Sequence, residues 1–227
     1  MELSNLYSEI QTRGITCIGD CREQRDNFLK HPASDTRMGI SLLIRVPNEV
    51  AEQIVKVEHK LCKAEPGQYY YPTPDLHITV LDVLAAKPDY VYTSSLVDSY
   101  NNVLTKVLSS FPSFSIFLKG IIPSPNAILV KGYYQKTLAQ IRQSIRKELH
   151  SERLPLDERY ETISSHITIS RFSDKLQNRT ELLRVLSEYA EYDFGEFEVK
   201  RLQLAYHNWY DSKKTILAEY PLSGAVS

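Results

Sequence analysis

The hydrophobic residues follow two patterns along the chain, one typical of buried strands and one typical of amphipathic helices, and these patterns occur twice in the same order. Residues 39–46 form an apolar run of strand length, and residues 127–131 form a second one. After each run, apolar residues recur every three or four positions, the spacing of a helix that covers a core. These positions are Val50, Ile54, Val57 and Leu61 in the first stretch and Leu138, Ile141, Ile145 and Leu149 in the second.

Each helical stretch leads to the same short motif within an apolar, β-branched run. The first copy is His77-Ile78-Thr79-Val80, and the second is His166-Ile167-Thr168-Ile169. Because side chains alternate between the two faces of a strand, each copy places a histidine and a threonine on one face and two apolar residues on the other. The copies lie 89 residues apart. We therefore interpret the chain as a duplicated α+β unit.

The duplication extends beyond the motifs but leaves out the start of the chain. The first motif is followed by a predicted helix over residues 96–108 and a strand over 114–118, and the second by a helix over 182–189 and a strand over 197–206. The first 37 residues stand outside this pattern. Their pattern predicts a short amphipathic helix followed by a charged loop. This N-terminal segment either lies over a cleft as a specificity element or packs on the outside.

The repeated motif indicates a specific chemistry. A duplicated unit places equivalent strands about a pseudo-two-fold axis, so the two His-x-Thr pairs should converge on a central cleft. There a neutral imidazole can take a proton while a protonated one gives a proton to a leaving group. The threonine hydroxyls can donate hydrogen bonds to the non-bridging oxygens of a phosphate. One His-x-Thr in a strand is usually an ordinary polar pair, but a second copy in a matching context favours an active site for phosphodiesters.

On these motifs the chain resembles the 2H phosphoesterase superfamily, whose signature is two His-x-Thr-x motifs in a duplicated α+β fold. Similar members include the LigT-like bacterial 2′-5′ RNA ligases and the 2′,3′-cyclic nucleotide phosphodiesterases. The resemblance covers residues 38–222 and implies a bilobal LigT-like domain, with pseudo-repeats over 38–125 and 126–222 and an N-terminal extension over 1–37. It also implies two antiparallel-rich sheets around a central cleft, with helices packed on the outside.

The resemblance further implies roles for individual residues. Two histidines would be the general acid and base, in an order that the sequence leaves open, and two threonines would bind the phosphate. The family often carries an arginine shortly after the second motif, and Arg171 matches it as a phosphate clamp. The first motif continues Leu81-Asp82-Val83 and has no such arginine. The implied catalytic residues are His77, Thr79, His166 and Thr168.

Charge and aromatic content narrow the class of substrate. The 27 basic and 28 acidic residues leave a net charge of −1, whereas proteins that grip long polynucleotides usually present a basic surface. We expect no extended nucleic-acid surface, and we interpret Arg142, Arg146 and Lys147 as the solvated face of a helix. A small nucleotide or an RNA end is the expected partner. Among 15 tyrosines, Tyr69 and Tyr71 precede the first motif and are candidate base-stacking contacts.

Other chemistry receives less support from the sequence. Neither motif has a second histidine or a carboxylate at metal-ligand spacing, and simple alternation places Asp82 on the strand face opposite His77. We expect no metal and no cofactor. The three cysteines should be free thiols, and the remaining histidines should lie on the surface. They are Cys17, Cys21 and Cys62, and His31, His59, His150 and His207.

The sequence also lacks a long apolar run and a signal-peptide pattern, so we expect a cytoplasmic monomer without a membrane span. The sequence is compatible with three classes of function. The leading hypothesis is a phosphodiesterase for 2′,3′-cyclic nucleotides, RNA ends or 2′-5′ linkages. RNA ligation is the reverse reaction and would use the same residues. A sugar mutarotase and a non-catalytic nucleotide-binding module are the other two.

Overall fold

The duplicated pattern of strand, helix and motif strand forms the centre of the protein. In the computed structural model, which describes residues 3–223, the first copy consists of β1 (Arg37–Arg45), α2 (Asn48–Ala64) and β3 (His77–Pro88). The second copy consists of β5 (Ala127–Tyr134), α4 (Lys136–Ser151) and β6 (Ile167–Arg171). The remaining helices are α1 (Leu3–Gly19), α3 (Ser94–Leu108) and α5 (Arg179–Glu188), with short 3₁₀ turns at Asn27–Leu29, Pro32–Ser34 and Thr73–Asp75. The remaining strands are β2 (Tyr69–Tyr70), β4 (Phe114–Pro123), β7 (Asp193–Val199), β8 (Arg201–Asn208) and β9 (Lys214–Pro221).

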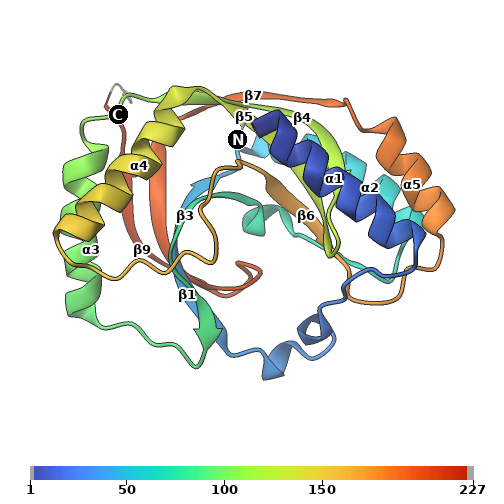
Figure 1. Cartoon of the computed structure of the whole chain (residues 1–227), viewed down its shortest axis with the longest axis horizontal. Coiled ribbons are helices and arrows are strands. Elements are labelled where there is room, and N and C mark those ends of the chain that lie inside the picture. Colours follow the sequence, from blue (N-terminus) through green and yellow to red (C-terminus); the bar gives the residue numbers. More distant parts are fainter. Residues whose placement is uncertain (1–2, 224–227) are drawn as a thin grey trace.

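The strands form one curled sheet rather than the two predicted sheets (Figure 1). Among the described residues, nine strands run in the order β7-β4-β5-β6-β3-β1-β8-β9, with β2 beside β6, and the named strands pair antiparallel. The two halves are joined because the motif strands β3 and β6 pair with each other, with Ile78 opposite Ile167. The α+β class was predicted correctly, and the division into two sheets was wrong.

The two halves of the sheet exchange strands. β4 follows the first motif in the sequence but pairs with β5 of the second copy, and β8 follows the second motif but pairs with β1 of the first. The single strand predicted over 197–206 is two strands, β7 and β8, which Lys200 separates. One half of the sheet therefore contains β8 and β9 from the second copy, and the other half contains β4 from the first.

The helices pack in groups at the two ends of the sheet. Helices α3 and α4 lie together at one end, α2 and α5 at the other, and α1 crosses in front of β4 and β5 (Figure 1). Tyr7 of α1 packs with Ile122, Ala127 and Leu129 of β4 and β5. Its hydroxyl accepts hydrogen bonds from the backbone N–H groups of Gly132 and Ser165 and donates one to the Gly132 carbonyl. The N-terminal helix is thus an integral part of one lobe.

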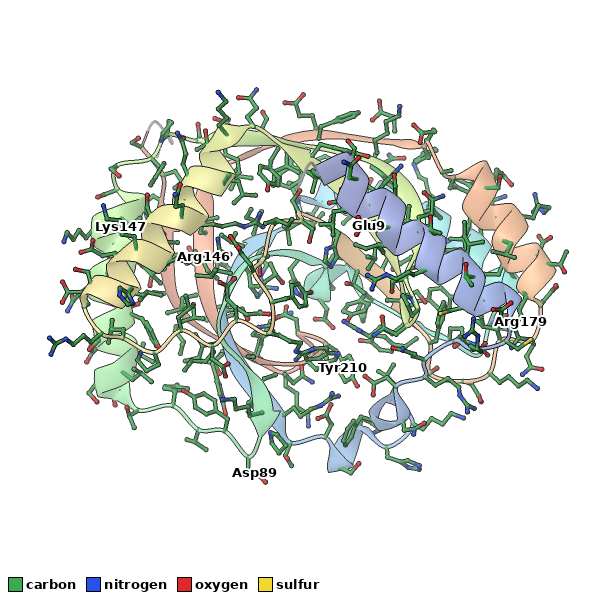
Figure 2. The ribbon with its side chains drawn as sticks, in the orientation of Figure 1. Glu9, Asp89, Arg146, Lys147, Arg179 and Tyr210 are labelled. Carbon is green, nitrogen blue, oxygen red and sulfur yellow. The ribbon has the colours of Figure 1, made fainter. Side chains whose placement is uncertain are left out.

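Helix α4 departs from the predicted pattern at one position. Lys147 is exposed as expected, and Arg146 lies on the other side of the helix, half-buried against Glu158 (Figure 2). Arg142, however, is 1% exposed. The prediction that it belongs to a solvated face was wrong, because its guanidinium binds backbone carbonyls under the motif strands. Across residues 3–223, no helix has the length and apolarity needed to cross a bilayer.

Candidate active site

The pairing of the two motif strands brings four polar side chains together. With Ile78 opposite Ile167 in an antiparallel pair, His77 faces Thr168 across the strands and Thr79 faces His166. Such opposed residues have Cβ atoms about 5 Å apart, and diagonal neighbours are about 7–8 Å apart. The two isoleucines are fully buried on the other face. The pseudo-two-fold axis therefore passes between the motifs, and both histidines and both threonines line one cavity of about 580 Å³.

Each motif strand contains a bulge just after its threonine. Thr79 pairs with Leu43 but Leu81 pairs with Leu42, so β3 holds one extra residue there. In β6, Thr168 pairs with Leu129 and Ser170 with Ile128, which shows the same shift. An extra residue reverses the alternation of side chains beyond it. The third residue after each threonine therefore points to the motif face.

These third residues are Asp82 and Arg171, and both line the cavity. The prediction that Asp82 lies on the face opposite His77 was wrong, because simple alternation takes no account of the bulge. Asp82 is instead the positional counterpart of Arg171. Its carboxylate accepts a hydrogen bond from Ser41 at 2.9 Å. The otherwise symmetrical site thus carries a carboxylate on one side and a guanidinium on the other.

The walls of the cavity come from segments outside the motifs. Helix α1 contributes Leu6, Ile10 and Arg13, so the N-terminal extension lies against the cavity rather than on the outside alone. The loop over residues 159–164, the β4–β5 turn over 124–126 and the end of β8 complete the walls. Ligand sites of 300–1,000 Å³ hold small molecules of roughly nucleotide size, and this cavity falls within that range.

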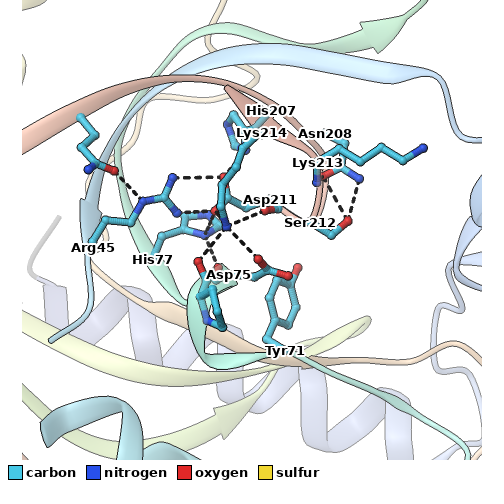
Figure 3. Close-up of polar contacts among 12 residues, drawn as sticks. Arg45, Tyr71, Asp75, His77, His207, Asn208, Asp211, Ser212, Lys213 and Lys214 are labelled. Carbon is cyan, nitrogen blue, oxygen red and sulfur yellow. Dashed lines mark hydrogen bonds and ion pairs between the residues drawn. The ribbon is translucent and has the colours of Figure 1, made fainter. Parts of the chain in front are cut away.

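His77 is fixed by its backbone neighbour. Its Nδ1 lies 2.7 Å from the carbonyl oxygen of Asp75 (Figure 3). Because a carbonyl oxygen only accepts hydrogen bonds, Nδ1 carries the hydrogen and Nε2 is the basic nitrogen of neutral His77. Burial lowers the pKa of His77 to about 4, although the nearby Asp211 carboxylate acts in the opposite direction. The Nδ1 atom lies 4.0 Å from an Asp211 oxygen.

Asp211 is the centre of a charged network behind His77 (Figure 3). It lies in the β8–β9 turn with a φ of 59°, a left-handed conformation that aspartate tolerates. Its buried carboxylate forms ion pairs with Arg45 and with Lys214 at 3.0 Å, and one of its oxygens lies 3.1 Å from the Nδ1 of His207. Burial would raise the pKa of Asp211, but His207, His77 and Arg45 hold it well below its usual range.

His207 was predicted to lie on the surface, and this prediction was wrong. Its side chain is 11% exposed, lines the cavity and lies with its ring centroid 6.0 Å from that of His77. The other three histidines outside the motifs, His31, His59 and His150, are exposed as expected. His207 lies on β8, which entered the first lobe by strand exchange, and this placement could not be read from local sequence.

His166 has a different neighbour from His77. Its Nδ1 lies 2.9 Å from the hydroxyl oxygen of Ser164, which can either donate or accept a hydrogen bond. Burial, with Arg171 and Arg142 nearby, lowers the pKa of His166 to about 4. With pKa values near 4, both motif histidines are neutral at pH 7 in this structure.

Arg142 links the two motif segments from beneath. Its guanidinium donates to the carbonyl of Val80 at 2.7 Å and that of Thr79 at 3.2 Å on β3. It also donates to Ser164 at 2.6 Å and Ile163 at 3.0 Å, just before His166. One buried side chain therefore ties the backbone of the first motif to the segment just before the second.

The predicted substrate contacts outside the motifs occupy different positions. Arg171 lines the cavity, and its Nε donates to the hydroxyl of buried Tyr71 at 2.8 Å. Tyr71 lines the cavity as well. Tyr69 packs against Tyr71, with ring centroids 5.1 Å apart, and is not among the residues that line it. Trp209 and Arg159 do line it, and no sequence signal pointed to Arg159, which lies in an irregular loop.

Among the described residues, possible metal ligands do not cluster and the cysteines are unpaired. Within residues 3–223, no group of three or more histidine, cysteine, aspartate or glutamate side chains is arranged to hold a metal ion. Cys17, Cys21 and Cys62 are free thiols, as predicted.

Comparisons with known proteins agree with the overall fold. Residues 46–210 match the model of the 2′-5′ RNA ligase superfamily. The fold is similar to protein TT0787 of Thermus thermophilus, with a TM-score of 0.61 and 18% identity over 84% of this chain and 100% of that one. It is also similar to Escherichia coli LigT in complex with 3′-AMP, with a TM-score of 0.60 and 15% identity over 82% of this chain and 99% of that one. No curated protein matches the sequence.

Proposed function

Because this chain belongs to the 2′-5′ RNA ligase superfamily of LigT-like 2H phosphoesterases, we propose that it hydrolyses a 2′,3′-cyclic nucleotide or an RNA-end phosphodiester without a metal. The observation that carries the proposal is the pairing of the motif strands, which sets each histidine opposite the other motif's threonine. Two imidazoles and two hydroxyls that line one cavity are the groups that general acid–base hydrolysis of a phosphodiester needs.

The chemical step transfers two protons. One histidine takes a proton from water as the water oxygen bonds to phosphorus, and the bond between phosphorus and one ribose oxygen breaks. The other histidine gives its proton to that departing oxygen. Thr79 and Thr168 donate hydrogen bonds to the non-bridging oxygens, where negative charge increases in the transition state. The product is a nucleoside 2′- or 3′-phosphate.

The surroundings of the two histidines support an assignment of their roles in this step. Neutral His77 carries its hydrogen on Nδ1, so Nε2 is free to accept a proton, and Asp211 stabilises the cation that forms. His166 lies beside Arg171 and Arg142, which favour the loss of its proton. His77 is therefore the base and His166 the acid. An anionic phosphate between the two rings offsets their burial, so a proton enters with the substrate.

The size and composition of the cavity support a nucleotide as the substrate. Structures of Escherichia coli LigT have been solved in complex with 3′-AMP, ATP and NADP⁺. In this chain, Arg171 would clamp the phosphate, and Tyr71 would hold Arg171 in position. Ligation would run the same step backwards. The presence of Asp82 in the cavity supplies the carboxylate that a sugar mutarotase would need, but that function leaves both threonines without a role.

The test is a hydrolysis assay in EDTA with 2′,3′-cyclic nucleotides and 2′-5′-linked oligonucleotides. His77→Ala and His166→Ala should each lower kcat by roughly 100-fold or more, the usual size of general acid–base effects. His59→Ala, on the exposed face of α2, is the matched control and should keep full activity. Wild-type protein that turns over no substrate, or turnover that survives both substitutions, would contradict the proposal. Turnover that EDTA abolishes and a divalent metal restores would contradict the metal-free mechanism.

A further inference from the structure

Two arginines in the cavity converge on one tryptophan. The guanidinium carbon of Arg159 lies 3.9 Å from the centroid of the Trp209 ring, and that of Arg171 lies 5.4 Å from it. Trp209 follows β8, Arg159 lies in the loop before the second motif, and Arg171 ends β6. All three line the cavity that holds the motif histidines. Segments distant in sequence thus bring two positive charges to one aromatic ring.

Neither guanidinium is neutralised within residues 3–223, since no carboxylate forms an ion pair with Arg159 or Arg171. The contrast with Arg37 is informative. Arg37 also lies 5.3 Å from the Trp209 ring, but it pairs with Asp35 at 2.7 Å and with Asp26 at 3.7 Å. The carboxylates of the cavity are engaged elsewhere: Asp82 accepts from Ser41 and Glu161 lies 3.5 Å from Arg146.

Arg159 makes no side-chain hydrogen bond to any described residue, although it lies within a site built from polar groups. Arg159 is exposed to solvent, and its partial desolvation lowers the pKa of its guanidinium. Asp82 acts in the opposite direction, and the nearby charges of Arg171 and Arg37 lower this pKa further. An anion between the arginines would relieve this repulsion. Stacking on an indole face leaves the N–H edges of a guanidinium free, and those edges bind phosphate oxygens in pairs.

We propose that Arg159, stacked on Trp209, binds a second phosphate of the substrate, while the motif residues and Arg171 hold the phosphate that is cleaved. The substrate is then a 2′,3′-cyclic nucleotide that carries a further phosphate on its 5′ side, either a terminal 5′-phosphate or the preceding phosphodiester of an RNA chain. A bare cyclic nucleoside phosphate would leave Arg159 without a partner. This inference rests on the proposed function, because it names the substrate of the same site.

The kinetic test compares three substrates: adenosine 2′,3′-cyclic phosphate, the same compound with a 5′-phosphate, and a dinucleotide that ends in the cyclic phosphate. Wild-type protein should prefer one or both of the longer substrates by about 10-fold or more in kcat/KM, the usual effect of a charge-assisted contact. Arg159→Ala should abolish this preference and leave the rate on the bare compound within about threefold. Arg159→Lys, which keeps the charge but loses the planar edge, should retain part of the preference.

The choice between the two longer substrates identifies the source of the second phosphate. Preference for the 5′-phosphorylated mononucleotide indicates a free nucleotide, and preference for the dinucleotide indicates an RNA end. Arg184→Ala is the matched control, because Arg184 is exposed on α5 and forms ion pairs with Glu181 and Glu188 of the same helix. A preference that is absent in wild-type protein, or that survives Arg159→Ala in protein with an unchanged melting temperature, would overturn the inference.

A binding measurement separates this inference from the proposed function. Calorimetry should show that wild-type protein binds adenosine 3′,5′-bisphosphate about 10-fold more tightly than adenosine 3′-monophosphate, and that Arg159→Ala binds both alike. This result without turnover would support the second phosphate site and contradict hydrolysis as the function. Turnover of cyclic nucleotides with equal binding of the two ligands would support hydrolysis and overturn the second phosphate site.

Discussion

His77 and His166 are each followed by isoleucine and threonine, but the groups around their rings differ. The Nδ1 of His77 faces a backbone carbonyl and, at 4.0 Å, the Asp211 carboxylate, whereas the Nδ1 of His166 faces the hydroxyl of Ser164. A carbonyl and a carboxylate favour an imidazole that gains a proton, and flanking arginines favour one that loses it. The duplicated motif supplies two equal imidazoles, and residues outside the motif make their roles unequal.

This difference predicts how Asp211→Asn alters the pH dependence. The negative charge of Asp211 raises the pKa of His77, so its removal should lower that pKa further and move the acidic limb of kcat/KM to lower pH. A weaker base reacts more slowly, and kcat/KM at the optimum should fall by about 10–100-fold. The measurement is a pH–rate profile from pH 4 to 9, with melting temperatures recorded at each pH.

Asp98→Asn is the matched control, because Asp98 is exposed on α3. A folded Asp211→Asn protein whose acidic limb moves to higher pH, or whose profile equals that of wild type, would contradict the role given to Asp211.

At the scale of single elements, the sequence predicted most helices and strands but not the β-bulges that decide which face of a strand a side chain occupies. The spacing of Val50, Ile54, Val57 and Leu61 fixes the buried face of α2, because a helix has only one period that buries them together. The bulges after Thr79 and Thr168 leave no such mark, since Val80-Leu81 and Ile169-Ser170 fit a regular strand as well as a bulge. Asp82 was therefore placed on the wrong face.

The N-terminal helix α1 offers a test at this scale, because it packs so closely that one glycine is required. A Cβ atom on Gly14 would lie 2.2 Å from the carbonyl oxygen of Pro123, whereas one on Gly19 would have no atom within 4 Å. Gly14→Ala should therefore push α1 away from the β4–β5 turn and destabilise the protein by about 1–3 kcal/mol. Because α1 lines the cavity, KM should rise as well.

Thermal melting and steady-state kinetics of the two glycine variants check this prediction. Gly19→Ala should melt no lower than wild type, since alanine favours a helix over glycine. If Gly14→Ala melted at the wild-type temperature with an unchanged KM, the close packing of α1 would contribute neither to stability nor to substrate binding.

At the scale of the whole molecule, the site exists only because two copies of one unit meet. Their motif strands form a single sheet, in which β4 of the first copy pairs with β5 of the second, and β8 of the second pairs with β1 of the first. The sequence predicted the convergence of the motifs, because a duplication implies an axis of symmetry. It could not predict that β8 would bring His207, Trp209 and Asp211 to the first motif, since strand exchange depends on long-range pairing rather than on local pattern.

Substitutions of Arg142 test how the two motifs are held in their relative position. Its guanidinium binds carbonyls of both motif segments, so it fixes the distance between the two histidines rather than touching the substrate. Arg142→Met should remove one donor from each of these carbonyls, of which that of Ile163 still accepts from the Tyr134 hydroxyl, and should cost on the order of 3 kcal/mol of stability. In protein that remains folded, kcat should fall by about 10–100-fold while KM changes less, because small misplacements of reacting groups slow the chemical step.

The assay temperature should lie well below the melting temperature of each variant, so that loss of folded protein does not lower the rate. Lys147→Met on the exposed face of α4 is the matched control and should match wild type in stability and kcat. Arg142→Lys keeps the charge but cannot reach both strands with one ammonium group, so its kcat should lie between those of wild type and Arg142→Met. A kcat that stays at the wild-type value in folded Arg142→Met would mean that sheet pairing alone sets the distance between the two histidines.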